Sequence, residues 1–178
     1  MKTTGSRAVL AVTGTMFLMF AAAGWATLAS AEELTMMAAV NKAGRQRMLT
    51  QRMVKAYCQI GLNVRRDEAR EQLRQAVAQF DSQLAELNRF APNLQLSESL
   101  AAVGGLWVPF KKIITSPYSR ESAEQVAVLN EELLQATQLV TTQLEALSGR
   151  PSARLVNLAG RQRMLSQRIA KFYMLREL

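Results

Sequence analysis

NLAGRQRMLSQRIAKFY, residues 157–173, repeats a stretch near the other end of the chain, NKAGRQRMLTQRMVKAY, residues 41–57. Twelve of the seventeen paired positions are identical, and they include a glycine, two glutamines and several basic residues. The copies lie too far apart to be neighbouring units of a solenoid. Apolar residues recur in each copy at spacings of three and four, so both copies predict helices.

The sequence between the two copies is helical in pattern as well, because Gly and Pro cluster at a few breaks and no stretch alternates with period two. The breaks predict helices over about residues 33–63, 67–90 and 119–147, a helix from Ser97 to a break at Ser116-Pro117, and a last helix from Pro151 to Leu178. We expect a kink or a restart near Gly105 in the third helix. The fold class is therefore all-α: an antiparallel four-helix-bundle-like domain with a fifth helix that repeats the first-helix motif.

One of these helices, over residues 119–147, has an apolar stripe at heptad spacing. Its members are Val126, Leu129, Leu133, Ala136, Val140, Gln143 and Leu147. We expect this stripe to face the core.

The first thirty-one residues have the features of an export signal. Lys2 and Arg7 precede an uncharged, mostly apolar run, and Ala29-Ser30-Ala31 has the form of a cleavage site. Cleavage would leave residues 32–178 as a single domain in the periplasm. The alternative is an uncleaved membrane anchor, since the apolar run is long enough to span a bilayer.

The charge balance restricts the partners. The formal net charge is +8, and loss of Lys2 and Arg7 with the signal would leave +6. A basic protein of this kind suits anionic partners such as lipid headgroups, polyanions or small oxyanions. The expected export argues against nucleic acid.

The residue types that usually carry chemistry are scarce. The chain has no histidine and a single cysteine, Cys58, which removes the commonest general base, the commonest metal ligand and any internal disulfide. Acidic residues are scattered along outer helix faces, where solvated pairs are the rule. We therefore expect no enzymatic activity, no cofactor and no metal. Cys58 is expected to be a buried apolar residue, with an intermolecular disulfide as the alternative.

Within each copy, the helical spacing places a glycine, an arginine, a methionine, a glutamine and a lysine on one face. These residues are Gly44, Arg47, Met48, Gln51 and Lys55 in the first copy, and Gly160, Arg163, Met164, Gln167 and Lys171 in the second. Leu49 and Met53 begin an adjacent apolar face that would pack into the bundle.

A glycine inside a helix costs about 1 kcal/mol relative to alanine, and its usual reason is the close approach of another backbone. If the two copies meet at Gly44 and Gly160, Arg47 and Arg163 come together. Two adjacent guanidinium groups repel unless an anion lies between them, and a planar oxyanion can accept from both. The alternatives are a solvated basic face over a core and a duplication without function.

The block AGRQRMLSQR, residues 159–168, and its twin at residues 43–52 closely resemble the motif of PilJ-type sensor domains, the N-terminal modules of type IV pili methyl-accepting chemotaxis transducers. The block is also similar to the P-box of nitrate/nitrite-sensing histidine kinases. The resemblance implies an extracytoplasmic four-helix module that holds nitrate or nitrite where the first helices of two subunits meet. By position it assigns the main ligand role to Arg47 and Arg163, with Gly44 and Gly160 as the points of close approach.

Because this chain carries both copies, we expect its first and fifth helices to take the part that two subunits take in the sensors. The leading hypothesis is an exported protein that binds or senses a small oxyanion, nitrate or nitrite, and passes it to a membrane receptor. The ligand-binding residues would be Gly44, Arg47, Met48, Gln51, Gly160, Arg163, Met164 and Gln167. The alternative is a helical interaction module that docks on an envelope receptor or a pilus or chemotaxis component without a small ligand. A homodimer through the motif helices stays open.

Overall fold

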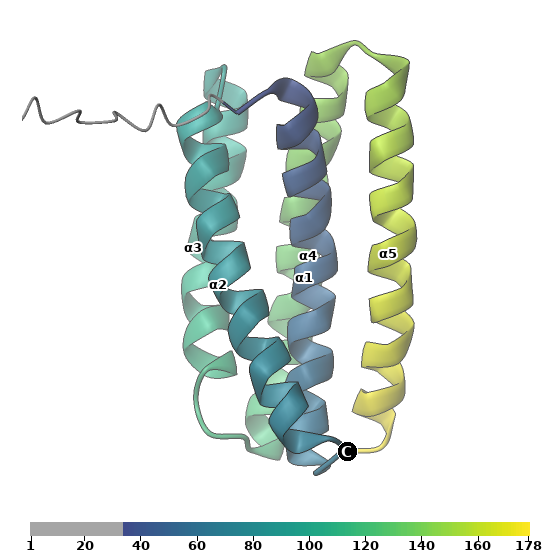
Figure 1. Ribbon diagram of the computed structural model, residues 1–178. Helices are drawn as coiled ribbons and strands as arrows, with labels where there is room; N and C mark the ends of the chain where they lie inside the picture. Colours follow the sequence, from purple (N-terminus) through teal and green to yellow (C-terminus); the bar gives the residue numbers. More distant parts are fainter. Residues whose placement is uncertain (1–33) are drawn as a thin grey trace, which may run out of the picture. The chain divides into compact units, whose positions relative to one another are not determined.

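The computed structural model describes residues 34–178, and this part of the chain consists of five α-helices joined by short connections (Figure 1). They are α1 (Met36–Gly61), α2 (Arg66–Phe90), α3 (Leu94–Ile114), α4 (Arg120–Ser148) and α5 (Pro151–Arg176). The predicted all-α bundle is confirmed. The predicted export signal lies outside the described residues. Within residues 34–178, no helix has both the length and the apolar character needed to cross a membrane.

At the centre of the arrangement lies α1, which packs against α2, α4 and α5, while α3 packs mainly against α4. Successive helices alternate in direction, so α1 and α5 run parallel to each other, side by side (Figure 1). The two copies of the repeat are carried by these two helices. Their neighbours differ: among the helices of residues 34–178, α1 is enclosed on several sides, whereas α5 contacts only α1 and α4.

The core is formed by the apolar faces of the first four helices. Leu49, Met53, Phe80 and Phe110 are fully buried in it. Between α2 and α3, the rings of Phe80 and Trp107 stack with their centroids 4.2 Å apart. Aromatic pairs in such arrangements contribute roughly 0.5–1.5 kcal/mol beyond the area they bury.

Helix α3 differs from the prediction in two ways. It begins at Leu94, three residues before the expected Ser97, because the side chain of Asn93 accepts a hydrogen bond from the backbone N–H of Leu96 at 2.9 Å and caps the helix. It also continues unbroken through Gly104, Gly105 and Pro109, so the expected restart does not occur. The buried stripe that includes Trp107 and Phe110 spans these positions, and its packing outweighs the weak local propensity.

Along α4 the observed core face differs from the predicted one. Val126, Leu133 and Val140 are buried as expected, but Leu147 is 44% exposed. Ala123, Leu134 and Leu144 are also buried, and three further core-facing positions hold polar residues that are fully buried, namely Asn130, Thr137 and Thr141. The two threonines donate to carbonyls of the preceding helical turn at 2.8–2.9 Å. The buried side of α4 therefore includes these residues and Asn130, and it faces toward α1 and α5.

Cys58 is fully buried in the core, as an apolar residue would be. Burial raises the pKa of its thiol to about 12, although the nearby charge of Lys171 acts in the opposite direction. The thiol is therefore protonated and shielded at neutral pH.

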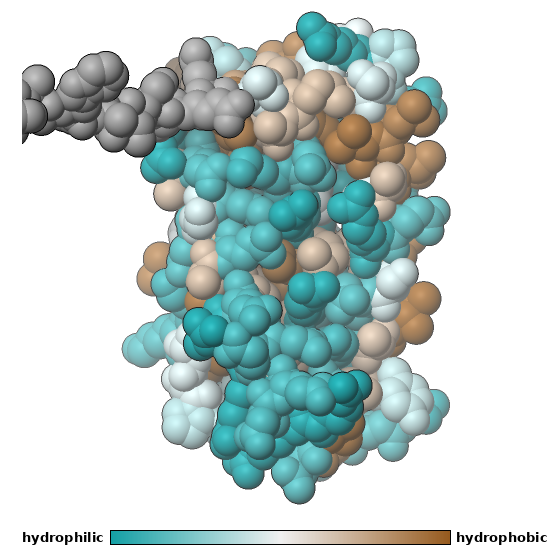
Figure 2. Space-filling model, viewed as in Figure 1, coloured by the Kyte–Doolittle hydropathy of each residue, from teal (hydrophilic) through white to brown (hydrophobic). Residues whose placement is uncertain are grey.

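The outer face of α5 is apolar and exposed. Its large residues follow spacings of three and four along the helix: Leu155, Leu158, Leu165, Ile169, Phe172 and Tyr173. Their exposed fractions run from 37% at Leu165 to 73% at Ile169. Figure 2 shows brown patches along the edge of the molecule where α5 lies, beside the largely hydrophilic surface of α2. In α1 the equivalent positions, Leu49, Met53, Ala56 and Tyr57, are buried in the core.

The two copies therefore offer a matched test of packing. Leu49→Ala should lower the free energy of unfolding by about 2–5 kcal/mol, because the side chain is fully buried at the centre of the bundle. Leu165→Ala, the same change at the equivalent position, should cost only a small fraction of that. Denaturant unfolding followed by circular dichroism measures both. Equal losses in the two variants would contradict this arrangement.

Candidate functional site

The site begins at the place where the two copies of the repeat meet. A Cβ atom placed on Gly160 would lie 3.7 Å from Gly44 Cα, so the backbones of α1 and α5 touch at the two glycines. Parallel helices that meet at equivalent residues are related by an approximate two-fold rotation about an axis along the seam between them. The absence of side chains at both positions is what permits this approach.

Arg47 fills the space that the two glycines leave. A Cβ on either glycine would lie 3.3 Å from Arg47 Nη2. The Arg47 side chain is fully buried, and its Nη1 donates to Gln138 Oε1 of α4 at 2.5 Å. Its Nη2 donates to Asn157 Oδ1 at 2.6 Å and to the Asn157 carbonyl at 3.2 Å. One guanidinium group therefore joins α1, α4 and α5.

Within residues 34–178, the charge of Arg47 has no direct carboxylate partner. Its hydrogen-bond acceptors are neutral amides, and one of these residues, Asn157, donates in turn to the carboxylate of Glu145. Burial and the neighbouring charge of Arg161 lower the pKa of Arg47 to about 10, while Glu145 raises it. The group is still charged at neutral pH, so the site holds a buried cation that is only partly compensated.

One donor of this guanidinium is free. Among the buried side-chain nitrogens and oxygens of residues 34–178 that lack a partner, Arg47 Nε is the single donor. The others are glutamine carbonyl oxygens, including those of Gln51 and Gln167 on the two motif helices. Buried polar groups without partners are uncommon in folded proteins, and three of these seven atoms belong to the predicted site residues Arg47, Gln51 and Gln167.

A second polar layer lies further along the same seam. Gln51 Nε2 donates to Asn130 Oδ1 at 2.9 Å, and Asn130 Nδ2 donates to the Thr50 carbonyl at 2.9 Å. From α5, the fully buried Lys171 donates to the same Asn130 oxygen at 3.0 Å and forms an ion pair with Glu131 at 2.6 Å. Both copies of the motif are thus fastened to α4 through buried polar side chains.

Most of the predicted site residues lie at this seam. Gly44, Arg47, Gln51, Gly160 and Met164 are buried, and Met48 and Gln167 are partly buried.

The expected pairing of Arg47 with Arg163 is wrong, because the structure places Arg163 in an exposed position. The reason is the two-fold relation between the copies. Arg47 lies on the side of the seam that α4 covers, and the rotation carries Arg163 to the opposite side. There, no helix among residues 34–178 takes the place of α4.

Several residues that build the site were not predicted. Gln138, Asn130 and Glu145 come from α4, and Asn157 and Lys171 come from the second motif copy. Asn157 is one of the identical positions of the repeat, so the repeat was a signal that could have identified it. The signal for the α4 residues is weaker: polar side chains at helical spacing on a face that must be buried.

The seam brings together hydrogen-bond donors, the groups from which an anion accepts. Its strongest groups are donors, namely a guanidinium, an ammonium and amide nitrogens. No group of three or more histidine, cysteine, aspartate or glutamate side chains in residues 34–178 is arranged to hold a metal ion. A planar oxyanion is the ligand that such donors complement.

The close approach at the glycines predicts an unusual response to alanine. At Gly105, in α3, a Cβ would meet nothing within 4 Å, so Gly105→Ala should stabilise the protein by up to about 1 kcal/mol. Gly160→Ala should bring no such gain, because its Cβ would press on Arg47 and Gly44. Gly160→Leu should cost about 1–3 kcal/mol more than Gly105→Leu. Denaturant unfolding measures all four, and equal effects at the two sites would exclude the close contact.

Comparison with known proteins gives one family. The model of the type IV pili methyl-accepting chemotaxis transducer N-terminal domain, PilJ, matches residues 28–140. Among curated proteins and among solved structures, no match is found. The match takes in the first motif copy and the helices around it, with Arg47 and Gln138 inside it, and stops before α5. On this evidence the chain belongs to the PilJ family, the sensory N-terminal domains of type IV pili chemotaxis transducers.

Proposed function

We propose that this protein is a non-enzymatic, periplasmic sensing module that binds a small oxyanion, nitrate or nitrite, at Arg47. One observation carries the proposal: a fully buried guanidinium at the crossing of the two motif helices, with neutral amides as its partners. Placing an anion against this group would offset the cost of burying its charge. The similarity of the motif to the P-box favours nitrate and nitrite over other anions.

The neighbouring amides could adapt to such a ligand. Gln138 and Asn157 now present oxygens to Arg47, but rotation of each side-chain amide would present an N–H₂ group instead. A trigonal anion seated beside the guanidinium would then receive hydrogen bonds from α1, α4 and α5 together. Met48 and Met164 would supply the apolar part of the surroundings.

A ligand at this position would change contacts between three helices at once. Arg47 is the single side chain here that bonds to both α4 and α5, so its acceptors determine how the two helices are held. Anion binding would thus change the contacts among α1, α4 and α5. A membrane receptor in contact with these helices could detect that change. The periplasmic location rests on the export signal expected in residues 1–31.

Isothermal titration calorimetry of the mature protein with nitrate, nitrite and sulfate tests the proposal. Nitrate or nitrite should bind, and Arg47→Ala should weaken binding at least tenfold, about 1.4 kcal/mol. Arg163→Ala is the matched control, because it removes the equivalent arginine from an exposed position and should change the affinity little. Absence of binding by all three anions, or equal losses in the two variants, would refute the assignment.

A second function, as a docking module of the pilus or chemotaxis apparatus, is favoured by a separate observation. The outer face of α5 exposes six large apolar residues, and five of their counterparts in α1 pack into the core. We infer that it binds a helical surface like the one that α2 and α4 present to α1. Such a surface would be apolar, with an amide oxygen placed for Arg163 as Gln138 is placed for Arg47. We propose the helical bundle of a PilJ-type transducer as this partner.

Binding of the purified sensory domain of a PilJ-type transducer tests this second function by sedimentation velocity. Ile169→Glu, at the most exposed apolar position of α5, should abolish the complex, whereas Leu139→Glu, on the exposed side of α4, should leave it intact. Nitrate should have no effect on the assembly. Self-association of the chain alone, or equal behaviour of the two variants, would contradict it.

A further inference from the structure

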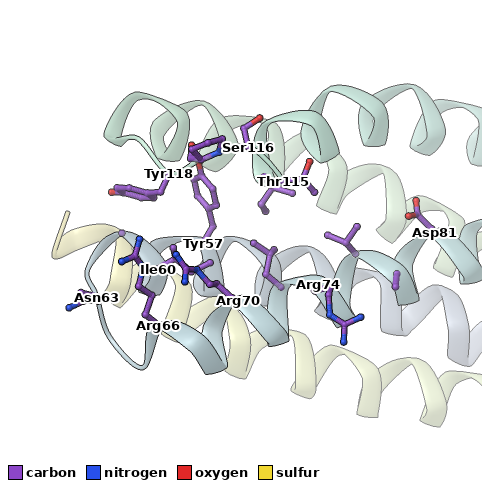
Figure 3. Close-up of a pocket in the computed structure, with 16 residues that line it drawn as sticks. Tyr57, Ile60, Asn63, Arg66, Arg70, Arg74, Asp81, Thr115, Ser116 and Tyr118 are labelled. Carbon is purple, nitrogen blue, oxygen red and sulfur yellow. The ribbon is translucent and has the colours of Figure 1, made fainter.

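A large groove opens between α2 and α3, far from the glycine crossing. Its volume is about 940 Å³, which is at the upper end of the range for small-molecule sites. Figure 3 shows Arg66, Arg70 and Arg74 along the α2 wall and Thr115, Ser116 and Tyr118 across from them. Nitrate or nitrite would occupy only a small part of this space.

The groove exists because α2 and α3 contact each other little along their length. Near the middle of both helices the gap is filled by the Phe80–Trp107 stack. From there toward the start of α2 and the end of α3, no comparable pair bridges the two helices. Leu73, Val77 and Ile114 instead form an apolar floor.

Two tyrosines fix the end of the groove. Tyr57 donates from its hydroxyl to the Pro117 carbonyl at 3.2 Å, and its ring centroid lies 5.3 Å from that of Tyr118. The Tyr118 ring in turn lies directly against Gly61, where an added Cβ would be 2.1 Å from a ring carbon. The aromatic wall is thus held in place by a hydrogen bond and by a glycine.

The rim is cationic. Arg66, Arg70 and Arg74 recur every fourth residue along α2, so they line one edge of the groove. Asp81 is the one carboxylate among the lining residues, and it already accepts from Trp107 Nε1 at 2.7 Å and from Lys111 at 2.6 Å. Arg70 and Arg74 share surface ion pairs with Asp67 and Glu71, which are worth little in water and can be exchanged.

We propose that this groove binds an amphipathic carboxylate: a molecule with an apolar chain or ring and one acidic head. The apolar part would lie on the floor against Leu73, Val77 and the tyrosines. The head would accept from Arg66 and Arg70, whose guanidinium forks match the geometry of a carboxylate. Among the charged lining residues, a cationic head of the same size would meet three arginines and an aspartate that is already paired. This site is independent of the oxyanion site at Arg47.

Calorimetry with sodium decanoate, below its micelle concentration, tests the proposal, with decyltrimethylammonium as the probe of opposite charge. Decanoate should bind saturably, and at least tenfold more tightly than the cation. The double variant Arg66→Glu/Arg70→Glu should lower decanoate affinity at least tenfold, while Arg120→Glu, an exposed arginine on α4, should not. Ala78→Trp, an exposed lining position, should obstruct the groove and weaken binding without disturbing the core.

Three outcomes would overturn it: no decanoate binding, equal affinity for the two amphiphiles, or unchanged affinity in the Arg66→Glu/Arg70→Glu protein. Circular dichroism verifies that each variant is folded. The same variants should bind nitrate as the unmodified protein does, so a failure of either site is distinguishable from a failure of the other.

Discussion

The contact between Gly44 and Gly160 sets the arrangement of the whole bundle. It brings the backbones of α1 and α5 together and leaves beside them a space that only the end of a long side chain can enter. Arg47 enters it, and because its two terminal nitrogens bond to Gln138 and Asn157, the orientation of α4 and α5 around α1 follows. Side chains at both glycine positions would have two effects: they would separate the helices and they would fill the space that the guanidinium occupies.

Much of the fold follows from the sequence because apolar residues at helical spacing leave few alternatives. Local signals at the helix ends add to this: Ser119 caps the start of α4, Gly149 ends α4 with a positive φ of 59°, and Pro151 begins α5. At α3 the local signals were misleading. Glycine and proline lower helix propensity by amounts that a continuous buried stripe can outweigh, so tertiary packing decided the outcome.

The candidate site was predictable in part, for a reason that lies in the repeat. Gly44, Arg47 and Gly160 could be selected from spacing alone, since a mid-helix glycine one turn from an arginine requires a nearby backbone. The role of Arg163 could not, because two similar sequences acquire different surroundings when only one side of the seam is covered by a third helix. The amides of α4 could not be recognised for a related reason, since a buried Asn130 or a half-buried Gln138 has the same sequence signature as a solvated residue.

The parallel course of α1 and α5 has a mechanical consequence. The start of α1 and the end of α5 lie at opposite ends of the bundle, separated by roughly 39 Å for a 26-residue helix (Figure 1). Tension applied between these two points would slide the helices past each other along their axes, so the bonds across the seam would bear the load together rather than one after another. The bonds that Arg47 and Lys171 form with α4 would then resist shear between α1 and α5.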